Sequence, residues 1–413
     1  MTRRFATAHG CTRAIVRAIA LAAALSSLAP QPVVAQSPVS QLPARSRFSA
    51  GMTVERVTFG SGILEADLAG ADSSRVLSAT GIALPIQFST VVGGVWLFDA
   101  GSHFTTGKRV IVGGDTLSDA LSGIGDIRLR LSRRFDRLGF RLTVGANVPT
   151  GITGLDASQT AILSVLASPA LGMTQPAVGF GAGATVGAVK SFASASRLWG
   201  VAVGTSLEWR GEYEPYAALA AGTSIDGYDP GEVIRVSAGA TRLFGESKAL
   251  LTASLDLFGV DQVTASAGAV PVEIQIGPTV SLDAQWLPAT TRVRNAALFA
   301  ALRLRSALSR DGAELPNSGN VVFEAGARGA RALSRATDLV FELSGRLLTA
   351  VEIDNRLATA ASSSVAPSLG LAISLSSWTL QPMLTARIGN VDTGIESGAF
   401  RVLGARVMLE RRF

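Results

Sequence analysis

Apolar and polar residues alternate with a period of two over most of the chain after residue 47. The clearest run is residues 272–286, where Val272, Ile274 and Ile276 alternate with Glu273 and Gln275. A period of two is typical of a β-strand with one apolar face. The alternation predicts strands at 48–59, 76–88, 92–104, 123–135, 140–148, 178–190, 198–210, 233–244, 249–258, 272–286, 296–305, 321–331, 339–348, 365–375, 378–388 and 400–413.

The links between these strands differ in length in a regular way. Short links at 136–137, 245–248, 334–337 and 376–377 alternate with longer ones such as 306–319, 350–363 and 390–397, and 105–122 is expected to be a long loop. A single array of this size exceeds the roughly ten strands of most open sheets, so closure is favoured. We therefore predict an all-β fold, a transmembrane antiparallel up-and-down β-barrel over residues 48–413. The count is about 16 strands, or 14 if the early segments are misassigned.

The face opposite the apolar one is rich in glycine, serine, threonine and charges of both signs. Such a face fits a barrel lumen, whereas the apolar face fits lipid, the first partner that we expect. Two interpretations of the charges stay open: an ion-pair network that stiffens the barrel, or a polar conduit. The charges are Asp126, Arg128, Arg130, Arg141, Glu208, Arg210, Arg235, Asp256, Glu273, Asp283, Arg303, Arg305, Glu324, Arg328, Glu342, Arg346, Arg387, Arg406 and Glu410.

The last strand, FRVLGARVMLERRF, ends on Phe413. This ending resembles the carboxyl-terminal signature that the barrel-assembly machinery of bacterial outer membranes recognises, which implies that machinery as a second partner. Arg411 departs from the signature, because a hydrophobic residue is more usual there. At the membrane interface, however, an outward arginine can reach the headgroup region at low cost.

The amino-terminal segment resembles a signal peptide rather than a part of the barrel. Residues 1–35 carry four arginines and no acid, then an apolar run over 18–25, and Val33 and Ala35 have the spacing that signal peptidase accepts. We predict cleavage after Ala35, a short periplasmic lead over 36–47 and export by the general secretory route. The cell outer membrane is the expected location. Apolar runs of about 20 residues, which spanning helices need, do not occur.

Cleavage would change the inventory of reactive groups. It removes Cys11, His9, four of the 37 basic residues and none of the 31 acidic ones, so the formal charge falls from +6 to +2. The sequence pI of about 10.2 is then no evidence for a nucleic-acid partner. Because His103 is the remaining histidine and no thiol is left, we expect no metal site, no disulfide, no catalytic cysteine and no cofactor.

Two loops carry the candidate contacts for a solute. Residues 152–177 break the alternation, and 157–167 suits a short helix capped by Asp156 in an extracellular loop. This helix is either a lid packed on the barrel rim or a gate that touches the solute through Leu155, Ile162 and Leu166. The second loop, 211–231, contains all three tyrosines, Tyr213, Tyr216 and Tyr228, for which interfacial packing and ligand stacking are both open.

A family resemblance rests on two motifs about 25 residues apart. A strand opens on GIGDI at 123–127, and after a tight turn the next strand closes on NVPTG at 147–151. This arrangement resembles the outer-membrane transporters named after the MetA pathway of phenol degradation and is more distantly similar to the fatty-acid-uptake barrels. The resemblance implies an outer-membrane barrel that passes small hydrophobic molecules.

We therefore expect a channel for the passive passage of a small hydrophobic or amphipathic solute, with Arg128, Arg130 and Arg141 as possible lumen contacts. The rival from another class is a barrel enzyme acting on lipid, with His103 near Asp99 and Ser102. Neighbouring strand residues point to opposite faces, so Ser102 cannot simply meet His103, and we predict no catalytic residues and no enzyme. A structural or adhesive barrel without conductance is the third possibility.

Overall fold

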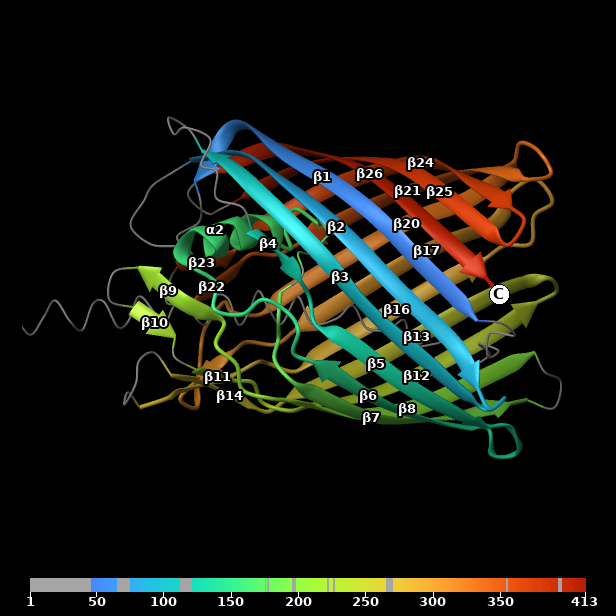
Figure 1. Ribbon diagram of the computed structural model, residues 1–413, viewed down its shortest axis with the longest axis horizontal. Coiled ribbons are helices and arrows are strands. Elements are labelled where there is room, and N and C mark those ends of the chain that lie inside the picture. The colour runs from blue at the N-terminus through green and yellow to red at the C-terminus, as the bar shows by residue number, and fades with distance from the viewer. Residues whose placement is uncertain are drawn as a thin grey trace, which may run out of the picture.

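The chain folds into a closed antiparallel β-barrel of 16 strands, one of which is divided into two segments (Figure 1). The computed structural model describes residues 46–64, 75–111, 121–174, 176, 178–194, 198–220, 223–225, 227–264, 270–353, 356–392 and 396–413. The predicted signal peptide and most of the predicted lead lie outside them. The wall strands are β1 (Arg47–Leu64), β2 (Arg75–Val92), β3 (Trp96–Ile111), β4 (Leu121–Ile124), β5 (Ile127–Phe135), β6 (Phe140–Val148), β7 (Gly183–Ala193), β8 (Trp199–Arg210), β12 (Val233–Phe244), β13 (Ser247–Phe258), β16 (Thr279–Leu287), β17 (Arg294–Arg305), β20 (Asn320–Ala332), β21 (Thr337–Leu348), β24 (Ala361–Leu375), β25 (Trp378–Asp392) and β26 (Ser397–Arg412).

Each wall strand pairs with the next wall strand along the chain, and the last pairs with the first. Strand β26 lies antiparallel to β1 from Arg47 opposite Arg412 to Phe59 opposite Phe400. Strands β4 and β5 both pair with β3, so the two segments count as one strand of the barrel. The prediction of an up-and-down barrel with 16 strands, rather than 14, is confirmed. Closure gives each wall strand two neighbours, which satisfies the backbone hydrogen bonds that hydrocarbon cannot.

The two ends of the barrel differ. At the turn end, short links join the strands, and both Arg47 and Arg412 lie there. A 3₁₀ turn, η1 (Asp136–Leu138), makes one of these links and closes on Gly139 in the left-handed conformation. At the loop end, long links carry the small strands β9 (Tyr216–Ala220), β10 (Thr223–Ile225), β11 (Gly227–Asp229), β14 (Val260–Thr264), β15 (Val272–Gln275), β18 (Ser309–Arg310), β19 (Ala313–Glu314), β22 (Val351–Ile353) and β23 (Arg356–Thr359).

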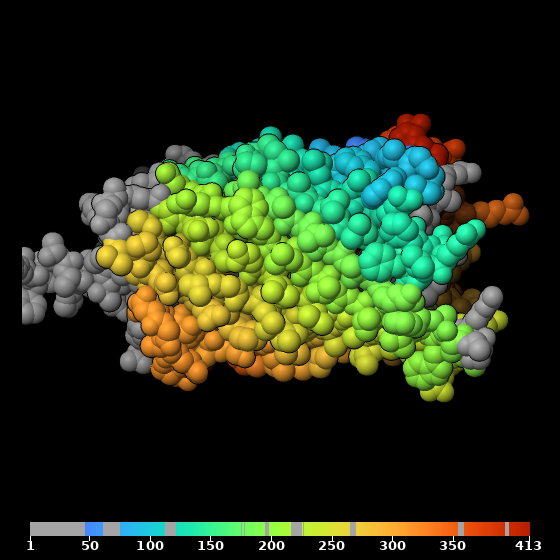
Figure 2. All heavy atoms as spheres, turned by 90° about the horizontal axis from the view of Figure 1, so that it is seen from below, coloured from blue at the N-terminus to red at the C-terminus, as the bar shows by residue number. Residues whose placement is uncertain are grey.

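The two faces of the wall have the predicted polarities. On β26, Leu403 is 67% exposed on the outside, whereas the neighbouring Val402 is 3% exposed on the inside. The outward positions of the other strands are likewise mostly apolar, and Figure 2 shows one side of this wall as a continuous surface. Among the described residues, no helix is both long and apolar enough to cross a membrane.

Several predicted strand bounds are wrong because the alternation of apolar and polar residues continues across bends in the backbone. The predicted strand at 272–286 is divided into β15 and β16 at Gly277, where a side chain would collide with the carbonyl oxygens of Ser306 and Ala307. The predicted strand at 123–135 is likewise divided into β4 and β5 at residues 125–126, and the wall strand predicted at 178–190 begins only at Gly183.

The third predicted strand is shifted along the chain. Residues 92–104 were expected to form it, but Gly93 and Gly94 adopt positive φ in a turn, so β3 begins at Trp96. The strand then continues to Ile111, well into the predicted 105–122 loop, and it carries the small residues Thr105 and Gly107 on its lumen face.

Candidate functional site: an inner loop in the mouth of the barrel

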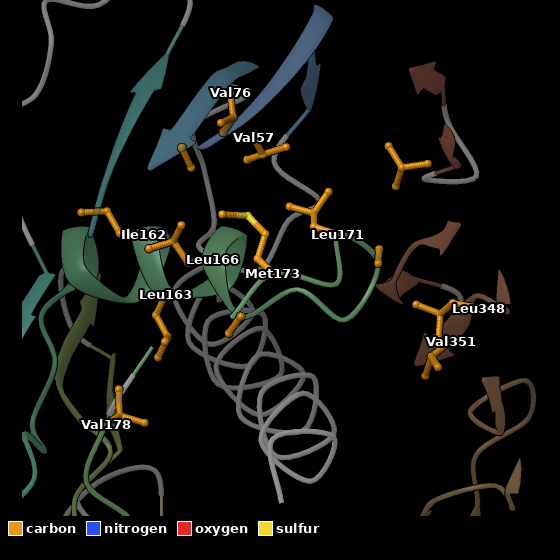
Figure 3. Close-up of a cluster of buried hydrophobic side chains, with 14 of the residues drawn as sticks. Val57, Val76, Ile162, Leu163, Leu166, Leu171, Met173, Val178, Leu348 and Val351 are labelled. Carbon is orange, nitrogen blue, oxygen red and sulfur yellow. The ribbon is translucent and has the colours of Figure 1, made fainter. Parts of the chain in front are cut away.

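The link between β6 and β7, residues 149–182, folds into the loop end of the barrel; we call it the inner loop (Figures 1 and 3). It contains helix α2 (Ala157–Leu166), as predicted from the sequence. The Asp156 carboxylate accepts a 2.8 Å hydrogen bond from the Gln159 backbone N–H, and Gln159 Oε1 accepts one from the Asp156 N–H. This reciprocal capping box satisfies two free donors of the first turn. The Gln159 N–H also holds the pKa of Asp156 below its usual value.

Helix α2 packs against the inner surface of β2, β3 and β4. Ile162 and Leu166 are each 1% exposed. Gly107 of β3 makes this contact possible, since a Cβ there would overlap the Leu166 side chain. The helix is therefore held mainly by apolar contact with the wall, within the mouth rather than on top of the rim.

The wall around the inner loop is apolar at this level, and we call this part of the lumen the apolar vestibule. Its buried wall residues are Val57, Phe59, Val76, Ala79, Leu121, Leu348, Val391, Phe400 and Val402. Leu155, Leu171 and Met173 of the inner loop belong to the same buried cluster, which Figure 3 shows in part. An open depression of about 480 Å³ lies at the rim beside Leu348 and Val391, and most of its lining is polar, with Ser362, Asn390 and Asp392 among it.

A single carboxylate, Asp126, fastens both ends of the inner loop to the wall. Asp126 is 4% exposed at the break between β4 and β5. It accepts hydrogen bonds from the Gly151 N–H at 2.8 Å and from the Phe180 N–H at 2.7 Å. Asn147 Nδ2 donates a third, at 2.7 Å. The two sequence motifs therefore meet here, because Asp126 belongs to GIGDI and both Asn147 and Gly151 belong to NVPTG.

The far edge of the inner loop reaches β1 and the guanidinium groups that project from β21 and β25. The Thr174 N–H donates a 2.5 Å hydrogen bond to Glu55 Oε2 on β1. Gly172 adopts a φ of 60°, and a Cβ built there would lie 2.6 Å from Arg387 Nη1 and 2.9 Å from Arg346 Nη1. Glycine suits this position because of its positive φ, which other residues rarely adopt. Sequence reasoning did not single out Gly172, Glu55 or the Asp126 clamp, because these contacts join segments far apart in the chain.

The three arginines predicted as lumen contacts all lie on the β5–β6 hairpin and face inward. Arg130 Nε donates a 2.9 Å hydrogen bond to Asp99 Oδ2, so its charge is paired. Arg128 lies opposite Asn147, at the level of the Asp126 clamp, whereas Arg141 lies opposite Arg134 near the turn end. The structure thus spreads the three along the lumen instead of gathering them at α2.

The tyrosine loop forms a structural cluster at the loop end. Tyr213 and Tyr228 pack edge to face with ring centroids 5.4 Å apart, and the Tyr228 hydroxyl donates a 2.5 Å hydrogen bond to Asp261 Oδ2. Burial raises the pKa of both tyrosines and of Asp261, although Arg210 opposes the shift of Asp261. The backbone of Tyr216 lies in β9, but its side chain is outside the described residues. Packing thus accounts for two of the tyrosines.

The residues considered for the enzyme alternative are not brought together. His103 faces the lumen, whereas Ser102 lies on the other face and donates a 3.0 Å hydrogen bond to the Gly125 carbonyl. Asp99 is bound by Arg130 and by Ser89. Within the described part of the chain, no three histidine, cysteine, aspartate or glutamate side chains are grouped so as to hold a metal ion.

Comparisons with solved structures return other barrels. A bacterial polysaccharide outer membrane secretin is 12% identical over 88% of this chain and 98% of its own, with a TM-score of 0.42. A deltaS2 mutant of the TodX monoaromatic hydrocarbon channel is 10% identical over 91% and 93%, with a TM-score of 0.46. Outer membrane protein OpdK of Pseudomonas aeruginosa is 8% identical over 89% and 98%, with a TM-score of 0.41. Neither a protein-family model nor a curated relative matches the sequence.

Proposed function

We propose that this barrel is an outer-membrane channel for the passive passage of small hydrophobic or amphipathic compounds. The observation that carries the proposal is the inner loop, whose helix α2 lies in the mouth against the apolar vestibule. A mouth that only had to admit ions or sugars would have no need of an apolar lining. An apolar solute can replace the contacts that hold the helix, because the hydrophobic effect is not directional.

The proposed location rests on the outer surface of the barrel. Its outward positions are rich in large apolar side chains, as a lipid-facing wall requires. In this orientation the turn end faces the periplasm and the loop end faces the outside. The terminal Phe413 is 53% exposed, and its N–H bonds to the Ser46 carbonyl, so the final strand could be recognised by assembly machinery before it closes on β1.

The inner loop has the construction of a movable element with fixed ends. Asp126 holds its two ends by charge-assisted hydrogen bonds, whereas α2 itself is held by apolar contacts. Charged hydrogen bonds with good geometry are the stronger and more directional of the two. Displacement of α2 would therefore leave both ends of the loop anchored, and the loop would return to the same place.

Planar-bilayer recording tests the proposal. The mature chain is refolded and compared with a variant in which residues 155–174 are replaced by a short glycine-serine linker that keeps Gly151 and Phe180. We expect low conductance for the wild type and a several-fold higher conductance for the variant, because the linker cannot fill the mouth. Heat-modifiable mobility on a gel verifies that both chains are folded barrels. Two folded but silent barrels would contradict a channel.

A further inference from the structure

Three strands finish at the turn end of the barrel with the same pattern, an arginine, any residue and a phenylalanine. These endings are residues 133–135 after β4, 242–244 of β12 and 411–413 of the final strand. In each case the arginine lies opposite a tryptophan that begins a neighbouring strand: Trp96, Trp199 or Trp378. We call each such set of three side chains a Trp–Arg–Phe triplet.

Each triplet places its guanidinium over two aromatic rings. The guanidinium carbons of Arg133, Arg242 and Arg411 lie 4.8, 4.4 and 4.5 Å from the ring centroid of the phenylalanine two residues on. Their distances to the indole rings are 5.2, 4.7 and 5.0 Å. Aromatic rings attract the positive charge through their faces. They do not replace the acceptors that the five N–H donors of a guanidinium need.

The described part of the chain brings no acceptor to these donors. Within it, none of the three guanidinium groups forms an ion pair or a hydrogen bond, and Arg411 Nε is buried without a partner. Two carboxylates close by in the sequence are already paired, Glu410 with Arg412 and Asp136 with Arg134. The three groups are therefore open to an acceptor from outside the chain.

The triplets lie at the level expected for lipid headgroups. Arg401 and Arg411 both face outward on β26, ten residues apart. Ten residues correspond to about 34 Å of strand, or about 25 Å of height at the usual tilt of about 40°. That height equals the apolar band of outer-membrane barrels, which places Arg411 at one edge of the band. The outward residues between the two arginines are all apolar: Leu403, Ala405, Val407 and Leu409.

Two other cations at the turn end show what a triplet adds. Lys190 lies 5.7 Å from the ring centroid of Phe192, but its Nζ donates a hydrogen bond to the Leu138 carbonyl. Arg331 faces outward on β20 opposite Leu339, and among the described residues it lies over no aromatic ring. Arg331 thus has the charge and the location of a triplet arginine without the two rings.

We propose that the three triplets bind the phosphate groups of phospholipids in the membrane leaflet at the turn end. A guanidinium holds a phosphate through two parallel N–H···O hydrogen bonds, and the rings restrict its orientation for that contact. A phospholipid fits better than a free anion because Leu131 and Leu409 come next on the same outward faces and can contact acyl chains. This inference rests on the proposed membrane location and does not require transport.

Native mass spectrometry of the refolded mature chain in neutral detergent tests the sites with two lipids that have the same acyl chains. Palmitoyl-oleoyl phosphatidylglycerol carries a phosphate, and palmitoyl-oleoyl glycerol does not. We expect wild type to bind the first about tenfold more tightly, with three copies retained, since a hydrogen bond to a charged group is worth at least that factor. R133Q/R242Q/R411Q should lose the preference, and R242Q alone should lose one retained copy.

R331Q is the matched control and should retain all three copies, and heat-modifiable mobility verifies that each variant is a folded barrel. Equal affinity for the two lipids in wild type, or an unchanged preference in the triple variant, overturns the phosphate sites. A loss in R331Q as large as that in R242Q also overturns them, because any basic residue at this end would then suffice. Displacement of the lipid by an equal concentration of inorganic phosphate would show a free-anion site instead.

The outcomes are separable from those of the channel proposal. The three arginines face away from the lumen, so R133Q/R242Q/R411Q should conduct like wild type in a planar bilayer. A silent wild-type bilayer would overturn the channel and leave the lipid sites in place. Loss of the lipid preference with unchanged conductance would support the lipid sites alone.

Discussion

At the scale of single residues, Asp126 shows how one side chain can organise a site. Sequence reasoning placed it among the lumen charges of the barrel. In the structure its two oxygens receive three hydrogen bonds, from Asn147, Gly151 and Phe180. Three donors from three segments can be satisfied only by an acceptor with several lone pairs, which explains why an aspartate stands at this break in the wall.

Replacement of Asp126 by alanine should release both ends of the inner loop. The loss of charged, buried hydrogen bonds costs about 3 kcal/mol locally, which corresponds to a roughly hundredfold faster amide exchange at Gly151 and Phe180. Hydrogen-exchange mass spectrometry measures this, and bilayer recordings should show larger or noisier currents. Asp136→Ala, which removes an exposed partner of Arg134 at a turn-end link, is the control. Unchanged exchange in the Asp126 variant would refute the clamp.

At the scale of secondary-structure elements, α2 depends on its cap as well as on its apolar contacts. It has only ten residues, too few to be stable alone in water. Asp156→Ala should destabilise its first turn by about 1 kcal/mol, because the Gln159 N–H loses its acceptor. We expect roughly fivefold faster amide exchange over residues 157–160. Ser158→Ala, which leaves the cap acceptor in place, should have a smaller effect, and equal effects would argue against capping.

The strands and the helix can be predicted largely from local sequence patterns, whereas the contacts between these elements cannot. Alternation located β6 and β12 to the residue, because each has one outer face in lipid and one inner face in the lumen along its whole length. Alternation continues across Gly277 and Pro278, so it could not reveal the bend there. Asp156 and the irregular pattern after it predicted α2. That α2 lies in the mouth depends on Gly107, Asp126 and Gly172, whose roles are set by residues distant in sequence.

At the scale of the whole molecule, the turn end carries a repeated lipid-facing contact. Arg133 lies opposite Trp96, Arg242 opposite Trp199 and Arg411 opposite Trp378, each with its guanidinium over the indole ring at 4.7 to 5.2 Å. Arg411, which departs from the carboxyl-terminal signature, thus has Trp378 as its partner. Its guanidinium also lies 4.5 Å from the ring centroid of Phe413. Each of the three tryptophans is the first residue of its strand, β3, β8 or β25, so the pairs recur at the turn end in three parts of the wall.

Replacing these three tryptophans together by leucine should lower the stability of the barrel by about 3 kcal/mol. Each cation–π pair contributes about 1 kcal/mol, and the sites are far enough apart to add. Urea unfolding in phospholipid vesicles measures the loss. Trp209→Leu, at an outward position that is 49% exposed and has no cation contact among the described residues, is the matched control for a lost lipid-facing indole. A triple variant that loses no more than three times the control would count against the pairs.

The clamp at Asp126 also has a consequence for redesign. One carboxylate holds Gly151 and Phe180 side by side, so both ends of the chain between them are fixed at one place on the wall. The segment from 152 to 179 could therefore be exchanged while its two attachment points on the wall stay in place. Other peptides could be inserted there to turn the barrel into a sensor pore, while β6 and β7 kept their register.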